Sequence, residues 1–225
     1  MDSTVTSLSQ ARCSLTTLAY EKLEELIVTL KLNPGSTHNE KKLQQLTGIG
    51  RTPVREALQR LSREGLIEIL PRKGIKITEV EYEGGFLRVE LARTLLALMA
   101  RTSAVRATSE QKQAFADIAT SFDRIIQTPE LDLFMQVDKK MLNLLCEACH
   151  NEHICRAISL LASEHRRIGY IHFQKHDDIA VFARIRAEFS RALNRGDPEA
   201  AEAIVHQRMD YIESTLKGET QTSAR

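Results

Sequence analysis

The chain has 225 residues, of which 42% are hydrophobic and 27% are charged, and it contains no Trp. That length fits one large domain or two small ones, and the aliphatic content excludes a chain that is disordered throughout. No run of about 18 apolar residues is present, which excludes a membrane-spanning helix. Residues 1–14 are polar and lack the basic start and apolar run of a secretion signal, so we expect a flexible tail on a cytoplasmic protein.

The positive charge of the chain is concentrated in one segment. Between Lys41 and Lys76 there are nine Lys and Arg residues against three Glu residues, an excess of +6. The net charge of the whole chain is +1, so the rest of the chain carries −5. A basic module beside an acidic one is typical of a protein that binds a polyanion such as DNA.

Residues 15–79 predict helices followed by a β-hairpin. The helices are expected at 15–30, 39–46 and 52–64, and the strands at 66–70 and 75–78. A Gly-containing turn separates the second helix from the third. In the third helix Val54, Leu58 and Leu61 recur on one face, which leaves the opposite face free for contacts. Two short helices, a tight turn and a hairpin predict a winged helix-turn-helix.

The rest of the chain predicts helices only, in a six-helix bundle. They are expected at 81–106, 110–127, 130–149, 152–171, 177–195 and 198–216. The fold class is therefore mainly α, with an N-terminal winged helix-turn-helix and a C-terminal all-α bundle. The expected boundaries are a tail at 1–14, the first domain at 15–79, the second at 80–217 and a tail at 218–225.

The basic residues of the first domain fall where a winged helix contacts DNA. Arg51 and Thr52 open the third helix, whose N-terminal amides favour phosphate, and Arg55 lies one turn further on. An Arg in the major groove can bond guanine through two hydrogen bonds. Arg72 and Lys73 at the hairpin tip can reach the adjacent minor groove or the backbone.

The segment from Leu18 to Thr78 resembles the N-terminal domain of GntR-superfamily transcription regulators. The strongest stretch is GIGRTPVREAL at 48–58, and PRKG at 71–74 follows it. Where this family has Ser or Thr capping the recognition helix, the chain has Gly50, which is still a tolerable cap. The resemblance implies DNA contacts at Lys41, Arg51, Thr52, Arg55, Arg72, Lys73 and Gly74.

The helical second domain resembles the FCD effector domain of the FadR-type branch, and its six helices are similar to the VanR-like subgroup. We expect a homodimer on double-stranded DNA, because two-fold symmetry lets two recognition helices read the halves of an inverted repeat. From the two-module layout we expect a repressor that a small carboxylate releases from DNA. The alternatives are an activator, or a regulator that ignores ligand. No enzyme motif is present.

Many FCD domains bind a divalent metal through an Asp and three His. Asp138 matches the Asp, but Leu142, Arg186 and Arg208 stand where the three His belong. Neither Leu nor Arg binds a metal, so we expect no metal and no cofactor.

Asp138, Arg186 and Arg208 interrupt apolar stripes, so each is expected to point inward and to need a partner. One interpretation is an internal ion pair of Asp138 with either Arg. The other is that the two Arg replace the metal and bind an anionic effector. Both can hold together. Arg88 and His165 are further candidates for the effector site.

The segment CEACH at 146–150 has the spacing of a c-type haem attachment motif. A zinc site from Cys146, Cys149, His150, His153 and Cys155 is a second reading, although its spacing fits no closed site well. Either would make the chain a redox or metal-binding protein instead of a regulator. Otherwise Cys155 and Cys13 are expected to be ordinary reduced thiols.

Overall fold

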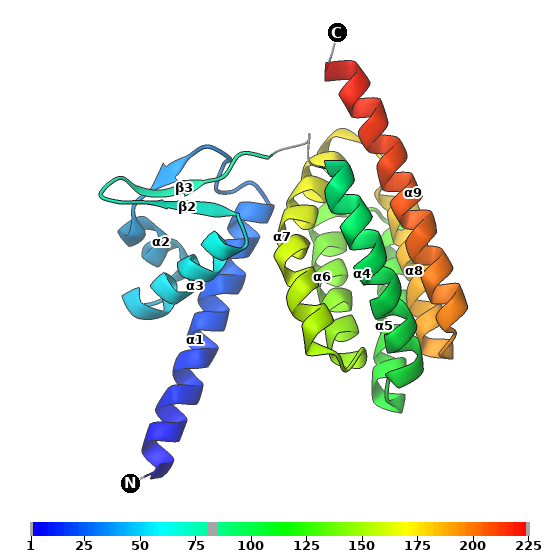
Figure 1. Cartoon of the computed structure of the whole chain (residues 1–225), viewed down its shortest axis with the longest axis horizontal. Coiled ribbons are helices and arrows are strands. Elements are labelled where there is room, and N and C mark those ends of the chain that lie inside the picture. The colour runs from blue at the N-terminus through cyan, green and yellow to red at the C-terminus, as the bar shows by residue number, and fades with distance from the viewer. Residues whose placement is uncertain (1, 81–84, 224–225) are drawn as a thin grey trace. The chain divides into compact units, whose positions relative to one another are not determined.

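The computed structural model describes the backbone of residues 2–80 and 85–223, and the side chains of residues 15–80 and 87–214. The chain divides into two compact units (Figure 1). One comprises residues 1–80 with 160–169, and the other comprises residues 81–159 with 170–225. Among the residues that the structure describes, no helix combines the length and apolar character needed to cross a membrane.

The N-terminal part of the first unit is the predicted winged helix-turn-helix, and we call it the head. Its elements are α1 (Asp2–Val28), β1 (Thr37–His38), α2 (Glu40–Thr47), α3 (Arg51–Arg63), β2 (Ile67–Leu70) and β3 (Gly74–Ile77). The strands form an antiparallel sheet in the order β1-β3-β2. The two-residue strand β1 was not predicted, because it is too short to show a periodicity.

Helix α1 begins at Asp2, earlier than the Leu15 that the sequence pattern predicts. The predicted tail at 1–14 lies outside the residues whose side chains are described, so it stays a prediction. The predicted tail at 218–225 also lies outside the described side chains, although the backbone of α9 continues to Ser223.

The head has one apolar core, and its composition follows the sequence pattern. The buried residues of α3 include Val54, Leu58 and Leu61, as predicted. They pack with Leu23 of α1 and Ile77 of β3. Burial of one face of α3 directs the opposite face to solvent.

The predicted six-helix bundle is confirmed. Its helices are α4 (Gly85–Arg106), α5 (Ser109–Gln127), α6 (Leu131–Ala148), α7 (Glu152–Lys175), α8 (Ile179–Arg195) and α9 (Pro198–Ser223). Thr108 is the N-cap of α5 and forms a reciprocal capping box with Gln111. Gly196, in the left-handed region, ends α8 as expected from the Gly-Asp-Pro sequence. Large aromatic side chains such as Phe115, Phe122 and Phe134 fill the core.

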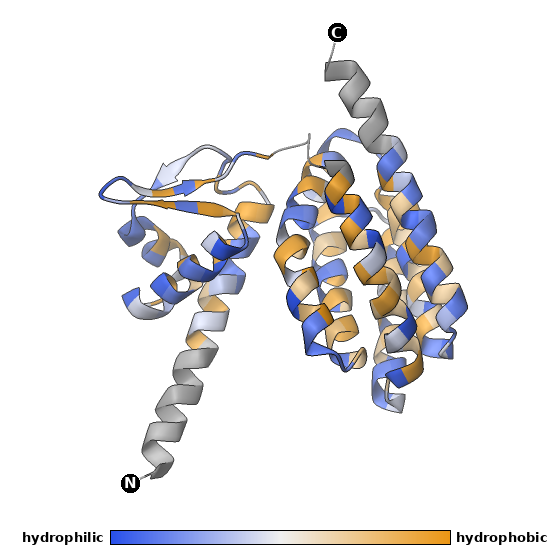
Figure 2. Ribbon diagram, viewed as in Figure 1, coloured by the Kyte–Doolittle hydropathy of each residue, from blue (hydrophilic) through white to orange (hydrophobic). Residues whose placement is uncertain are grey.

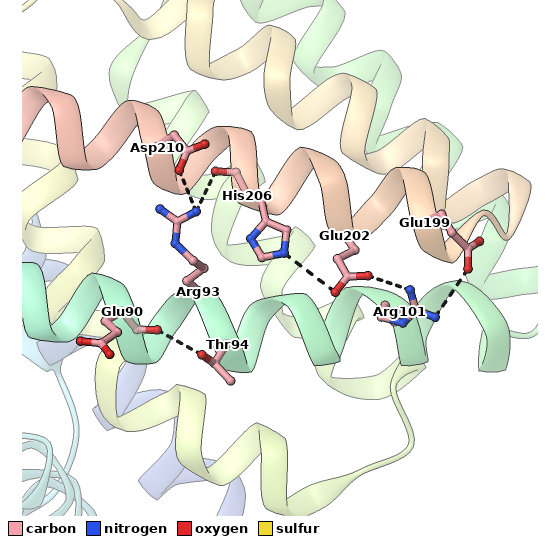
Figure 3. Close-up of polar contacts among 8 residues, drawn as sticks. All are labelled: Glu90, Arg93, Thr94, Arg101, Glu199, Glu202, His206 and Asp210. Atoms are coloured by element: carbon pink, nitrogen blue, oxygen red, sulfur yellow. Dashed lines mark hydrogen bonds and ion pairs between the residues drawn. The ribbon is translucent and has the colours of Figure 1, made fainter.

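Helices α4 and α9 are joined by a seam of ion pairs (Figure 3). Arg93 of α4 pairs with Asp210 at 2.8 Å and with Glu213 at 2.9 Å. Arg101, two turns further along α4, pairs with Glu202 at 2.7 Å. Arg93 comes before Arg101 in α4, whereas the partners of Arg93 come after the partner of Arg101 in α9. The two helices therefore run antiparallel.

Candidate DNA-binding surface and effector site

The exposed face of α3 carries three of the residues predicted to contact DNA. Arg51, Thr52 and Arg55 are all exposed, while the apolar face of the same helix is buried. Gly50 is the N-cap, and it forms no side-chain cap bond. No side chain therefore caps the first amides of α3, where the helix dipole favours a phosphate.

Glu40 connects Arg51 and Arg55 of α3, a role that the sequence analysis missed. Its Oε1 accepts from Arg51 Nε at 3.1 Å, and its Oε2 accepts from Arg55 Nε at 3.0 Å. Glu40 opens α2, directly after the N-cap residue Asn39. The carboxylate holds both guanidinium groups on one side of α3. The signal for this pairing is weak in sequence, because Glu40 is 11 and 15 residues away from its partners.

The tip of the hairpin between β2 and β3 is exposed and hydrophilic (Figure 2). Arg72 and Lys73 form this tip, and the Lys73 amide donates to the Leu70 carbonyl at 3.1 Å. Arg72 has a φ of +62°, a left-handed conformation that few non-Gly residues adopt. Lys41, on α2, is exposed as well.

Gly74, which was predicted to contact DNA, has a structural reason to be Gly. Its φ is +113°, and a Cβ there would lie 2.6 Å from the backbone oxygen of His38 in β1. The residue therefore lets β1 approach β3 closely. Its predicted contact with DNA stays a prediction.

Helix α1 braces the recognition helix with polar contacts. Tyr20 donates to Glu64 at 2.7 Å, and the guanidinium of Arg60 lies 3.6 Å from the centre of the Tyr20 ring. Burial raises the pKa of Tyr20, so its hydroxyl remains a donor. Thr16 donates to Glu56 at 2.6 Å. These contacts give α3 a fixed orientation within the head.

The bundle brings three of the five predicted effector-site residues together, and we call Asp138, Arg186 and Arg208 the arginine cluster. Arg186 Nη2 lies 2.5 Å from Asp138 Oδ1, and both side chains are largely buried. The predicted ion pair is therefore confirmed for Arg186. Burial, and then repulsion by Arg186, lower the pKa of Arg208 to about 9, while Asp138 opposes this shift.

For Arg88 and His165 the structure gives the helix and the exposure of each side chain. Arg88 is half-buried on α4, and His165 is half-buried on the segment of α7 that belongs to the first unit. Their part in an effector site stays a prediction.

The arginine cluster does not fit the metal that the FCD resemblance implies. Asp138 offers a carboxylate, but the aligned Leu142, Arg186 and Arg208 offer no metal ligand. Across the described part of the chain, no group of three or more His, Cys, Asp or Glu residues could hold a metal ion. The chemistry of this donor set favours an anion.

A second polar group, which the sequence analysis missed, lies between the end of α7, the start of α8 and α9. His172 Nε2 is 2.7 Å from Asp178 Oδ2, and the Tyr211 hydroxyl donates to the same oxygen at 3.1 Å. Burial, and then this hydrogen bond to Asp178, raise the pKa of Tyr211. Tyr211 is three residues after Arg208 on α9, so the two side chains share a helix face.

The CEACH segment lies at the end of α6 and in the turn to α7. Cys149 is fully buried, whereas covalent haem attachment needs a thiol that the haem can reach. His150 and His153 are exposed. The burial of Cys149 therefore argues against haem attachment. In the described part of the chain, no group of three or more His, Cys, Asp or Glu residues could hold a metal ion, and this argues against the zinc site.

Two family matches cover most of the chain. Residues 15–77 match the family described as bacterial regulatory proteins, gntR family, and residues 89–211 match the FCD domain. The boundaries of both matches fall close to those of the head and the bundle.

Relatives and solved structures agree with these matches. The HTH-type transcriptional repressor RspR of Escherichia coli K12 is 24% identical over 202 residues, which cover 88% of this chain and 87% of that protein. The Nta operon transcriptional regulator of Aminobacter aminovorans is 25% identical over 149 residues, which cover 66% of this chain and 70% of that protein.

The fold is similar to that of E. coli McbR/YncC, with a TM-score of 0.78 at 16% identity, covering 92% of this chain and 98% of that chain. A structure described as a GntR regulator from Rhodococcus sp. RHA1 has a TM-score of 0.69 at 18% identity and covers 91% of this chain and 98% of that chain. At these identities the likeness concerns the fold alone. With the two family matches spanning both domains, the chain belongs to the gntR family of bacterial regulatory proteins, and it is a DNA-binding transcription regulator with an FCD domain.

Proposed function

We propose that this regulator is a cytoplasmic repressor, released from an inverted-repeat operator by a small carboxylate metabolite. The observation that carries the proposal is the arginine cluster, a buried set of two guanidinium groups and one carboxylate in the bundle. A cluster with excess positive charge favours binding of an anion over further internal pairing. The E. coli relative that is named a repressor supports the direction of regulation.

The head reads DNA through the exposed face of α3. In the free protein Arg51 and Arg55 are paired with Glu40, and guanine or phosphate acceptors replace the carboxylate when DNA binds. The hairpin tip, with Arg72 and Lys73, supplies contacts that do not depend on sequence.

Gel shifts with the protein's own upstream DNA and with random DNA test this assignment. Arg55→Ala costs about 1–3 kcal/mol on the specific site, whereas Lys73→Ala weakens binding to both DNAs and reduces the salt slope by about 1. Arg63→Ala is the matched control, because Arg63 is an exposed basic residue at the other end of α3. Equal losses for Arg55→Ala and Arg63→Ala on both DNAs would contradict the assignment.

The proposed homodimer is supported by an apolar stripe on α4. Leu87, Leu91, Leu98 and Val105 are 72%, 50%, 48% and 68% exposed. Their spacings of four, seven and seven residues place them along one helix face. Exposed apolar side chains in a continuous row are typical of an interface. In a dimer with two-fold symmetry, the row of one copy packs against the same row of the second copy.

Light scattering after gel filtration tests the dimer. The double variant Leu91→Glu/Leu98→Glu is expected to be a folded monomer with weaker operator binding, because each chain then meets two carboxylates at the interface. Leu133→Glu is the control, since Leu133 is 37% exposed on α6, outside the stripe. A dimer that survives the double change places the interface elsewhere.

We propose that the effector acts by shifting the population between a conformation with high DNA affinity and one with low DNA affinity. A ligand that binds better to the conformation with low DNA affinity moves the chain toward that conformation. If a saturating carboxylate leaves operator affinity unchanged, the proposed response fails, and a regulator that binds DNA regardless of ligand is favoured. A reporter assay with and without the gene separates a repressor from an activator.

A thermal-shift screen of small carboxylates and divalent metals identifies the effector class. A ligand at about 100 times its Kd adds about 2.7 kcal/mol to the free energy of unfolding. The shift is expected for carboxylates in the wild type and is expected to be lost in Arg186→Ala and in Arg208→Ala. A shift with metals alone would overturn the assignment of the arginine cluster.

A further inference from the structure

Three thiols gather where α6 ends and α7 begins. Cys146 lies in the last turn of α6, Cys149 is the C-cap of that helix, and Cys155 lies in the first turns of α7. The Sγ atoms of Cys149 and Cys155 are 3.5 Å apart. Cys149 is fully buried, while Cys146 and Cys155 are half-buried. One thiol of the close pair is therefore reachable from solvent and the other is enclosed.

The backbone holds the two sulfur atoms in contact. Cys149 Sγ and Cys155 Sγ both donate to the carbonyl oxygen of Cys146, at 3.4 Å and 3.3 Å. Asn151 caps α7 by accepting from the amides of His153 and Ile154. A disulfide has an S–S length of about 2.05 Å, so the sulfur atoms need to approach by roughly 1.5 Å. Closing the disulfide removes both S–H donors, so one covalent bond replaces the two hydrogen bonds to the Cys146 carbonyl.

The turn is also attached to a second helix. Arg106, at the C-terminal end of α4, donates from Nη1 to the carbonyl oxygen of Cys149 at 2.8 Å. Ser103, one turn earlier on α4, donates to the carbonyl oxygen of Leu145 at 3.2 Å. A covalent change at Cys149 therefore affects a turn that joins α6 to α7 and is hydrogen-bonded to α4.

We propose that Cys149 and Cys155 form a reversible modification site, a dithiol that a hydroperoxide oxidises to an intramolecular disulfide. The half-buried Cys155 loses its proton and attacks the hydroperoxide. The O–O bond breaks, the departing alkoxide takes up a proton to leave as an alcohol, and Cys155 becomes a sulfenic acid. Cys149 then attacks the Cys155 sulfur, the S–O bond breaks, and hydroxide leaves with the Cys149 proton as water.

The two steps balance. The dithiol loses two electrons and two protons, and the hydroperoxide is reduced to one alcohol and one water. A small dithiol reverses the reaction by thiol–disulfide exchange. Burial raises the pKa of both thiols, so only a small fraction is thiolate at neutral pH, and the oxidation is expected to be slow there and to become faster as the pH rises.

Hydrogen peroxide is the probe, and the full chain is the protein. All proteins in the experiment carry Cys13→Ser, because the Cys13 side chain lies outside the described residues. The chain has four cysteines, so three remain. Mass spectrometry of the intact chain, thiol titration and peptide mapping are read before and after oxidation, and again after dithiothreitol. Circular dichroism verifies that each variant is folded.

The oxidised parent is expected to lose the mass of two hydrogen atoms and to keep one titratable thiol, and dithiothreitol restores the other two. Peptide mapping joins Cys149 to Cys155. Cys146→Ala is the matched control and is expected to give the same disulfide. Cys149→Ala and Cys155→Ala are each expected to lose it; where the buried Cys149→Ala variant does not fold, the half-exposed Cys155→Ser variant decides. Oxygen addition without a disulfide, or a disulfide through Cys146, overturns the proposal.

Discussion

Arg208 is a half-buried residue whose guanidinium Nε is enclosed, and its replacement by an apolar side chain is expected to stabilise the bundle. Its Nε is buried and forms no hydrogen bond within the described part of the chain. The pKa falls from the ordinary value of 12.5 to about 9, and this fall corresponds to roughly 5 kcal/mol of preference against the charged form. The neighbouring side chains repack only partly around a new Met, so the gain is smaller than this preference. We expect Arg208→Met to raise the free energy of unfolding by about 1–4 kcal/mol at pH 7.

The pH dependence gives a second test of the same reasoning. Below pH 9 Arg208 is charged in the folded and the unfolded chain, so the full cost of burial is present. As the pH rises through about 9, the folded chain releases this proton while the unfolded chain keeps it. The unfolded state then binds more protons, so the free energy of unfolding rises by up to about 1.4 kcal/mol per pH unit. Arg208→Met is expected to lack this rise.

Urea unfolding of the wild type and of Arg208→Met at pH 7 and pH 10 measures the effect. The quantity compared is the difference in free energy of unfolding between the two proteins at each pH, because their other titratable groups are the same. Arg208→Lys is the control, since it keeps a cation at the site and is expected to bring no gain. Each kcal/mol corresponds to about 2–4 °C in Tm for a chain of this size. If Arg208→Met is less stable than the wild type at pH 7, or keeps the same pH slope, Arg208 is not a costly buried charge.

Three further predictions concern the head. Gly74→Ala is expected to cost about 1–3 kcal/mol, because φ is +113° and the new Cβ would meet the His38 oxygen. Gly48→Ala, at a φ of +68° with open space around it, is expected to cost less, and equal losses in urea unfolding would disprove the clash. Asn39→Ala removes the cap of α2 and is expected to lower the free energy of unfolding by about 1 kcal/mol; no change would show that the cap is replaced by water. Glu40→Gln is expected to tighten binding to random DNA at low salt, since the carboxylate that competes with phosphate is gone; an unchanged salt titration would argue against that competition.

The sequence was most informative where a contact follows from local periodicity. The spacing of Val54, Leu58 and Leu61 identified the buried face of α3, and this in turn identified Arg51 and Arg55 as exposed. The spacing along a helix fixes which side chains share a face, so no tertiary information was needed. The same reasoning found the six helices of the bundle and the inward direction of Asp138 and Arg186.

Tertiary structure decided the pairings between residues that are distant in the chain. The sequence left open whether Asp138 pairs with Arg186 or with Arg208, and the packing of α6 against α8 selects Arg186. Likewise, the contact of Cys149 with Cys155 depends on the path of the turn between α6 and α7. Helical periodicity gives the direction of a side chain about its own helix axis, but the crossing of two helices determines which side chains meet. The fold class and the exposed basic face were therefore determined by the sequence alone, and the partners of the buried charges and thiols were decided only by packing.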